Sequence, residues 1–230
     1  PVRLADYTAW AFQLSTIQLN VDVQDTFVLV KARMELEPRG GHQPLALRGV
    51  ELELLNVAID GRDLPTSDYR CSDGWLTIDQ PPEHAFVLET CCRIDPYNNS
   101  SLEGLYASGG MLSTQCEAEG FRRITFHPDR PDVLSRWTVR IEAARSSCPV
   151  LLSNGNAIAE EELADGRHAV TWEDPFPKPS YLFALVAGEL REIRDQFTTA
   201  SGRTVTLRLH VEEGDEPYTA HAMESLKRSM

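Results

Sequence analysis

The chain has 230 residues, with 35 acidic and 22 basic side chains, so its formal net charge is −13 at pH 7. This balance argues against binding of duplex nucleic acid by bulk charge, because the phosphate backbone would meet a negatively charged protein. Hydrophobic residues make up 42% of the chain, which is enough for a folded core and excludes general disorder. No run of about 18 apolar residues occurs, so we expect no membrane-spanning helix.

Alternation of apolar and polar residues predicts β-strands along most of the chain. Residues 17–23 alternate strictly, and residues 27–36 follow after a short polar break, which predicts an antiparallel pair. Residues 51–59 form a further strand candidate, and the Asp60-Gly61 dipeptide after them is a strong hairpin signal. The same alternation of apolar and polar residues predicts strands at 75–78, 85–93 and 137–143.

Turn chemistry organises the second half of the predicted β-region. Residues 150–153 and 157–163 flank Asn154-Gly155, and this pattern predicts a second hairpin. Residues 175–179 contain three prolines, which lack an amide donor, so regular strand pairing is not expected there. The apolar run 181–187 follows, and its composition predicts a strand that is buried on both faces.

The pattern changes near residue 189. Short strands joined by turns rich in Gly, Pro, Asn and Asp predict an all-β fold for residues 1–189, either a β-sandwich or a related open form. Residues 190–230 resemble two strands around Ser201-Gly202, followed by a helix with Pro217 in its first turn and Tyr218 and Met223 on its apolar face. We therefore expect a second domain to begin at residue 190 and the chain to be part of a longer protein.

Common signatures of catalysis are absent from the sequence. The six histidines never occur at i and i+4, the spacing of a helical zinc site, so no metal site is expected in this segment. Neither a nucleophile elbow nor a Gly-rich phosphate loop occurs. The five cysteines are scattered and odd in number, which favours a reducing compartment such as the cytoplasm. Arg122, Arg123 and Arg130 have acidic neighbours and are expected to form structural ion pairs.

One stretch, Leu102 to Pro131, looks like neither a buried strand nor a long helix. Within it Gln115, Glu117 and Glu119 recur at every second residue, and an extended backbone would place these three polar groups on one side. Two carboxylates and an amide carbonyl suit a cation, most naturally an ammonium group. Alternating glutamates are more often the solvated face of a strand, so the pattern by itself leaves both interpretations open.

Several blocks of sequence in this stretch and beyond it carry a family resemblance. In chain order they are LEGLY, STQCEAEGFRRIT, DRPDVLSRW, LLSNGN and DPFPKPSYLFALVAGEL. In this order and at these separations they closely resemble bacterial aminopeptidase N, a family of zinc metallo-aminopeptidases of the gluzincin class, from about residue 10 to residue 230. The resemblance implies an antiparallel, saddle-like β-sandwich domain at 1–189. It also implies that residues 190–230 are the first strands and helix of an α/β, thermolysin-like catalytic domain.

The same resemblance implies roles for single residues. Glu117 would be the anionic anchor for the free α-amino group of a peptide substrate, Gln115 its hydrogen-bonding neighbour, and Glu119 a structural residue. A cis peptide bond would join Glu117 to Ala118. The zinc ligands of the full-length enzyme, an H-E-x-x-H motif and a downstream Glu, would lie beyond Met230. No catalytic residue and no metal ligand is therefore expected in this segment, which would be inactive alone.

The expected full-length protein is a cytoplasmic aminopeptidase that removes single N-terminal residues from peptides. Its expected partners are peptides with a free N-terminus and its own catalytic domain, with no nucleic acid and no membrane. Two alternatives stay open. The chain could be a stand-alone β-sandwich binding or docking module, or part of a family member whose zinc motif has decayed. The sequence that follows Met230 distinguishes the three.

Overall fold

An eight-stranded sheet forms from the segments with alternating sequence. A computed structural model describes residues 3–230 of the chain. The spatial order of the strands is β13 (Asn156–Glu162), β14 (Arg167–Lys178), β11 (Ser135–Ala144), β1 (Phe12–Val23), β2 (Val28–Pro38), β8 (Phe86–Ile94), β4 (Glu53–Ile59) and β5 (Arg62–Asp63). β1 and β2 are antiparallel neighbours, and β4 and β5 pair around Asp60-Gly61, as predicted. β1 and β11 are parallel neighbours. The chain forms β2, β4, β5 and β8 on one side of β1 before it adds β11 on the other side.

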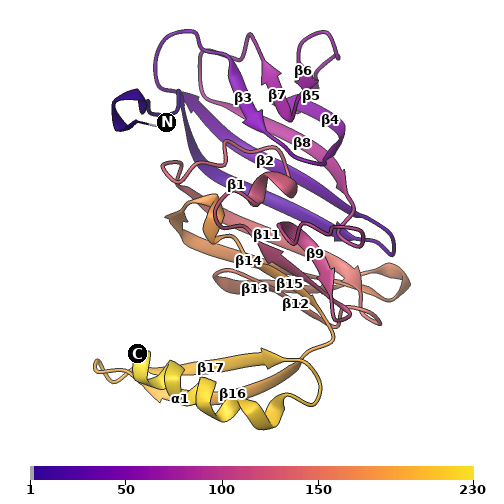
Figure 1. Cartoon of the computed structure of the whole chain (residues 1–230), viewed down its shortest axis with the longest axis vertical. Helices are drawn as coiled ribbons and strands as arrows, with labels where there is room; N and C mark the ends of the chain where they lie inside the picture. The colour runs from indigo at the N-terminus through magenta and orange to yellow at the C-terminus, as the bar shows by residue number, and fades with distance from the viewer. Residues whose placement is uncertain (1–2) are drawn as a thin grey trace.

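Two smaller sheets pack with the inner face of the large one (Figure 1). The four-stranded sheet has the order β12 (Val150–Ser153), β15 (Leu185–Gly188), β10 (Met111–Gln115) and β9 (Gly104–Ser108). The three-stranded sheet has the order β3 (Leu45–Arg48), β7 (Trp75–Ile78) and β6 (Arg70–Ser72). Leu47 and Leu112 of the small sheets share one buried cluster with Leu19 of the large sheet. Alternation therefore buries one face of β1, β2, β8 and β11 and leaves the other more accessible, as in a sandwich.

The hairpin predicted at Asn154-Gly155 is wrong. β12 pairs with β15 in the four-stranded sheet, whereas β13 pairs with β14 in the large sheet. The dipeptide instead carries the chain from one sheet to the other. Glycine is required there because a Cβ at Gly155 would lie 2.1 Å from the carbonyl oxygen of Glu173. The turn signal was therefore real, but local turn chemistry does not specify which strands pair.

The Pro-rich corner interrupts the regular pairing of β14, as predicted. β14 runs on to Lys178, but its register against β11 shifts between Ser135 and Trp137. The single buried strand predicted at 181–187 is wrong, since a 3₁₀ turn, η4 (Ser180–Leu182), occupies its first part. The turn is closed by the Phe183 amide, which donates to the Ser180 carbonyl at 3.0 Å. It directs the Phe183 side chain into the core before β15 begins.

The end of the chain forms a small unit below the sandwich in Figure 1. It consists of the antiparallel strands β16 (Arg191–Thr198) and β17 (Thr204–Val211), the 3₁₀ turn η5 (Glu216–Tyr218) and the helix α1 (Thr219–Ser229). Met223 of α1 is buried, whereas Tyr218, predicted on the same apolar face, precedes the helix and is 79% exposed. A mostly β fold with one late helix is thus confirmed. The domain boundary near residue 189 stays a prediction.

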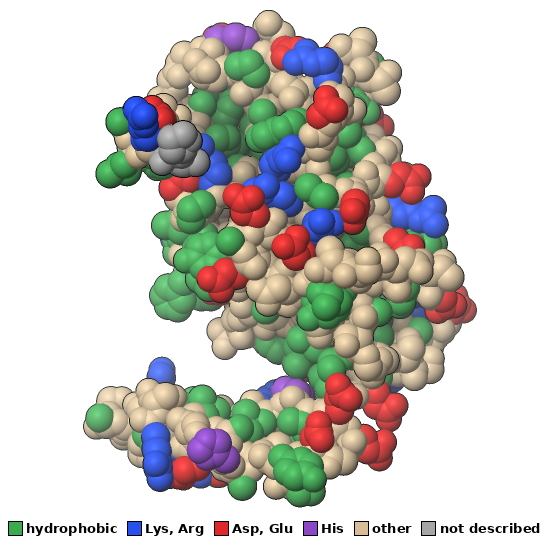
Figure 2. Space-filling model, in the orientation of Figure 1, with side chains coloured by type: hydrophobic (Ala, Val, Ile, Leu, Met, Phe, Trp, Pro, Cys, Tyr) green, Lys and Arg blue, Asp and Glu red, His purple; other side chains and the backbone are tan. Residues whose placement is uncertain are grey.

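Short 3₁₀ turns complete the secondary structure of residues 3–230. They are η1 (Leu4–Asp6), η2 (Phe121–Arg123) and η3 (Ala164–Gly166), besides η4 and η5. The space-filling view shows acidic and basic side chains interspersed over one face of the sandwich, and a deep indentation between the sandwich and the C-terminal unit (Figure 2). Within the described residues, no helix has the length and apolar character needed to cross a membrane.

Candidate functional site

The residues singled out in the sequence lie where β10 ends and η2 begins. Gln115 is the last residue of β10 and pairs with Gly104 of β9. The chain then turns over residues 117–120, and the Gly120 amide donates to the Cys116 carbonyl at 2.9 Å. The extended strip predicted for Gln115, Glu117 and Glu119 is therefore wrong, because the strand stops at Gln115. We call residues 115–120 the β10–η2 loop.

Buried residues hold both ends of the β10–η2 loop. Cys116 and Gly120 are buried, while Glu117, Ala118 and Glu119 between them are exposed. After Gly120, the ring of Phe121 is fully buried and packs edge-on against Trp137 and Phe183, with ring centroids 5.1 and 5.2 Å apart. The exposed residues thus project from a rigid aromatic core.

The structure brings Gln115 and Glu117 together. The Gln115 side chain donates from Nε2 to the backbone carbonyl of Glu117 at 3.1 Å. The Glu117–Ala118 peptide bond is cis, as the family resemblance implies. Within residues 3–230, the Glu117 carboxylate has no Lys, Arg or His partner within 4.0 Å. The predicted roles of both residues as a substrate anchor stay predictions.

Glu119 differs from Glu117 because its charge is already paired. Its Oε2 lies 2.9 Å from a terminal guanidinium nitrogen (Nη1) of Arg122, although the Glu119 side chain is 67% exposed. This pairing fits the structural role expected for Glu119. The β10–η2 loop therefore presents two carboxylates two residues apart. Glu119 is ion-paired with Arg122, whereas Glu117 has no Lys, Arg or His partner within 4.0 Å among residues 3–230.

Asp129 is a key residue of this region that the sequence did not reveal. Its side chain is 1% exposed, and both carboxylate oxygens are used. Oδ2 accepts from Arg122 Nε at 2.8 Å, and Oδ1 accepts from the Ser180 hydroxyl at 2.7 Å. The Asp129 amide in turn donates to His127 Nδ1 at 2.9 Å. Nothing in the sequence marks this carboxylate as buried, since burial of a loop residue is a property of the folded chain.

The expected structural role of the arginine cluster is confirmed. Arg122 bridges Glu119 and Asp129, while Arg123 contacts Glu51 at 2.6 Å and Glu103 at 3.2 Å, and Arg130 contacts Asp132 at 2.8 Å. His127 beside them is buried, and burial lowers its pKa to about 4 despite the opposing effect of the Asp129 carboxylate. This imidazole is therefore neutral at pH 7.

The described residues do not fit a zinc site. Between residues 3 and 230, no group of three or more His, Cys, Asp or Glu side chains is arranged to hold a metal ion. Burial raises the thiol pKa of both Cys92 and Cys116 to about 12, so neither offers a thiolate at neutral pH. The Nδ1 atom of His127 already accepts the Asp129 amide proton.

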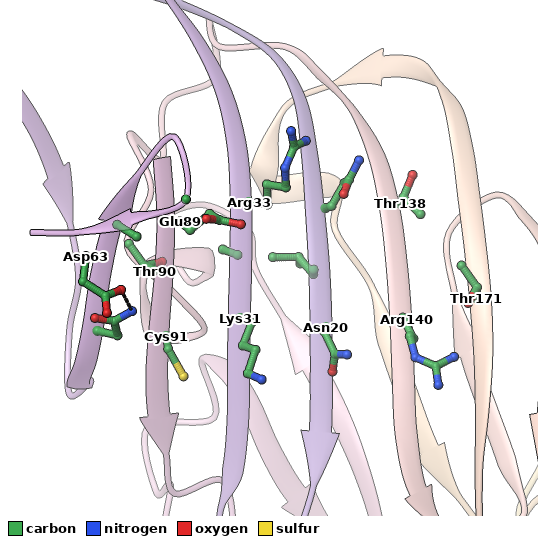
Figure 3. A pocket seen from close by; sticks show the side chains of 16 residues that line it. Asn20, Lys31, Arg33, Asp63, Glu89, Thr90, Cys91, Thr138, Arg140 and Thr171 are labelled. Atoms are coloured by element: carbon green, nitrogen blue, oxygen red, sulfur yellow. Dashed lines mark hydrogen bonds between the residues drawn. The ribbon is translucent and has the colours of Figure 1, made fainter. Parts of the chain in front are cut away.

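A cavity of about 570 Å³ lies on the outer face of the large sheet (Figure 3). Asn20 of β1 lies at its centre, opposite Lys31 of β2 and Arg140 of β11. Arg140 pairs with Glu142 of its own strand at 3.0 Å, and Glu89 adds a further negative charge to the lining. Charges of both signs therefore line this cavity, and none of the residues singled out in the sequence belongs to it.

Comparison with known proteins shows which family this chain is similar to. Residues 75–182 match the family described as "Peptidase M1 N-terminal domain". It is 52% identical over 230 residues to aminopeptidase N of Caulobacter vibrioides, covering 100% of this chain and 26% of that protein. It is 48% identical over 226 residues to aminopeptidase N of Escherichia coli, covering 98% and 26%. The chain thus spans about a quarter of the length of these relatives.

Solved structures resemble this chain as well. Aminopeptidase A of Legionella pneumophila, in complex with aspartic acid, matches with a TM-score of 0.95 and 34% identity, covering 100% of this chain and 27% of that one. An M1 zinc metallopeptidase of Deinococcus radiodurans matches with a TM-score of 0.75 and 15% identity, covering 94% and 52%, which shows a shared fold alone. Both comparisons agree with the β-sandwich described above.

Proposed function

We propose that this chain is the N-terminal domain of a zinc-dependent aminopeptidase that removes single N-terminal residues from peptides. The identity of 52% and 48% to two proteins named aminopeptidase N supports this proposal. Because residues 3–230 hold no metal cluster, the zinc and the hydrolytic chemistry are assigned to a catalytic domain elsewhere in the protein. In this proposal the M1 domain binds substrate and does not itself hydrolyse it.

The free carboxylate of Glu117 is the observation that carries the proposed binding role. The α-amino group of a peptide has a pKa of about 8 and is largely protonated at pH 7, so it can form an ion pair with a carboxylate. Glu117 is exposed and has no cationic partner within residues 3–230, and Gln115 lies against its backbone. An ion pair there fixes the first residue of the substrate, so that only the next peptide bond reaches the reacting groups.

Substitution Glu117→Gln in the full-length protein tests this role. A charge-assisted hydrogen bond contributes about 1.5–3 kcal/mol, so we expect kcat/KM for free-amine substrates to fall by roughly 10- to 100-fold. Thermal stability should be unchanged, because the side chain is exposed. Glu160→Gln on the edge strand β13 is the matched control, as Glu160 is also exposed. Wild-type efficiency of the Glu117→Gln enzyme would refute the anchor assignment.

We also assign the protein to the cytoplasm. All five cysteines lie in the described part of the chain and are free thiols, which supports a reducing compartment. Peptides with a free N-terminus are the proposed substrates, and the protein's own catalytic domain is the proposed partner of this chain. Fractionation of cells that produce the protein, followed by immunoblotting, tests the assignment. Recovery in an extracytoplasmic fraction would contradict it.

A further inference from the structure

Arg122 connects the exposed β10–η2 loop to the protein interior. Its Nε donates to the buried Asp129 carboxylate at 2.8 Å, and its backbone amide donates to the same oxygen at 3.2 Å. The other side of the guanidinium faces Glu119, with Nη1 at 2.9 Å from Oε2. Because Asp129 is fixed in turn by Ser180, the guanidinium is held from the inside and presents its outer edge to Glu119.

This arrangement decides which carboxylate of the loop is available. Glu119 shares the guanidinium of Arg122 with the buried Asp129, while Glu117 has no Lys, Arg or His within 4.0 Å in the described range. If Arg122 were removed, an incoming ammonium group would meet two uncompensated carboxylates two residues apart. Binding at Glu119 would place the first residue of the substrate in a different position from binding at Glu117.

We propose that Arg122 is a specificity-determining positioning residue that withholds Glu119 from the substrate amino group and leaves Glu117 as the anchor. The inference rests on the proposed function, because it concerns which carboxylate of the same loop positions the first residue of the substrate. Arg122 acts through Glu119 and does not touch substrate. The competing explanation is that Arg122 only stabilises the fold by compensating Asp129.

Steady-state kinetics of the full-length enzyme distinguish these explanations. The double substitution Arg122→Gln/Asp129→Asn removes the guanidinium without leaving the Asp129 charge buried and unpaired. A freed Glu119 binds substrate unproductively, which lowers kcat and KM by the same factor and leaves kcat/KM nearly constant. We expect both constants to fall about threefold, with kcat/KM within about twofold of wild type. Adding Glu119→Gln should restore both.

A purely structural role gives a different result. Distortion of the loop would lower kcat/KM itself, and Glu119→Gln would not reverse the loss. Arg140→Gln is the matched control, because Arg140 also pairs with two glutamates, Glu142 at 3.0 Å and Glu161 at 2.8 Å, on the outer face of the sheet. It should leave kcat and KM unchanged.

A second variant, Arg122→Lys, keeps the test valid if the double variant does not fold. Arg122→Lys retains a cation near Asp129, but a single ammonium group lacks the guanidinium fork that spans both carboxylates. The same parallel fall in kcat and KM is expected, with the same reversal by Glu119→Gln. If kcat and KM do not fall in parallel, or if Glu119→Gln does not restore them, the inference is overturned. The proposed function still stands in that case, provided that Glu117→Gln lowers kcat/KM. An unaffected Glu117→Gln enzyme would instead remove the proposed function.

Discussion

His127 lies in the interior next to the residues that hold the β10–η2 loop. Its ring packs edge-on against Phe121, with centroids 4.9 Å apart, and its Nδ1 accepts the Asp129 amide. Burial lowers its pKa to about 4 from its ordinary value of 6.5, and the nearby Asp129 carboxylate opposes this shift only in part. The folded protein therefore resists protonation at this position, whereas the unfolded chain does not.

This difference predicts a pH-dependent stability. The contribution of His127 is complete above pH 6.5 and is lost as the pH falls from 6.5 toward 4, because only the unfolded chain binds the proton in that range. We expect the free energy of unfolding to drop by about 2 kcal/mol between pH 7 and pH 5 from this group. Urea denaturation at several pH values measures it.

The control for this prediction is His127→Gln, whose amide oxygen can still accept the Asp129 amide proton but does not titrate. The variant should show a shallower loss of stability between pH 7 and pH 5 than the wild-type protein. Equal slopes in the two proteins would contradict the assignment of the pH dependence to His127.

The chemistry of single residues in the loop was only partly predictable. An ammonium-binding role for Gln115 and Glu117 is a prediction of the family resemblance, because residue type alone left the solvated face of a strand as an alternative. The sequence did not distinguish Glu117 from Glu119 by charge, because that difference depends on where Arg122 points. Its orientation is set by Asp129 and Ser180, which lie 7 and 58 residues away along the chain.

At the scale of elements, the turn from β10 into η2 depends on close backbone approach. A Cβ added at Gly120 would lie 2.3 Å from the Gln115 carbonyl oxygen and 3.1 Å from the Cys116 Cα. Gly120 has φ −80°, a conformation open to any residue, so the requirement for glycine is steric. The loop can therefore fold back on β10 only without a side chain at this position.

We expect Gly120→Ala to lower the free energy of unfolding by about 1–3 kcal/mol, because the loop must shift to admit the methyl group. Chemical denaturation measures the change. Gly61→Ala is the control, since a Cβ there meets nothing within 4 Å. Its only expected cost in the free energy of unfolding is about 1 kcal/mol, because alanine disfavours the φ of +73° at this position. A Gly120→Ala protein as stable as the wild type would show that the close contact is not a constraint.

Strands were predictable where burial alternates, and so were the neighbours β1–β2 and β4–β5, but the partners of β12 and β13 were not. β1 and β2 follow the alternation because one face of each strand lies in the core. The failed hairpin at Asn154-Gly155 and the 3₁₀ turn at Ser180–Leu182 have the same cause, namely that packing between distant segments determines which local option is used. Alternation and turn residues report local geometry alone.

At the scale of the whole molecule, the sandwich is a support for the β10–η2 loop. Phe121 ties the loop to Trp137 of the large sheet and to Phe183 next to the four-stranded sheet, so three separate elements fix its base. Many acidic side chains form ion pairs, whereas the Glu117 carboxylate has no Lys, Arg or His partner within 4.0 Å among residues 3–230. A rigid base and a free carboxylate are what an anchor for an ammonium group requires.

The most direct test is a crystal structure of the full-length protein with a bound dipeptide that has a free N-terminus. The account predicts that the dipeptide amino nitrogen lies about 2.7–3.0 Å from a carboxylate oxygen of Glu117, while Glu119 stays paired with Arg122. An amino nitrogen bound by Glu119, or more than about 4 Å from Glu117, would contradict it.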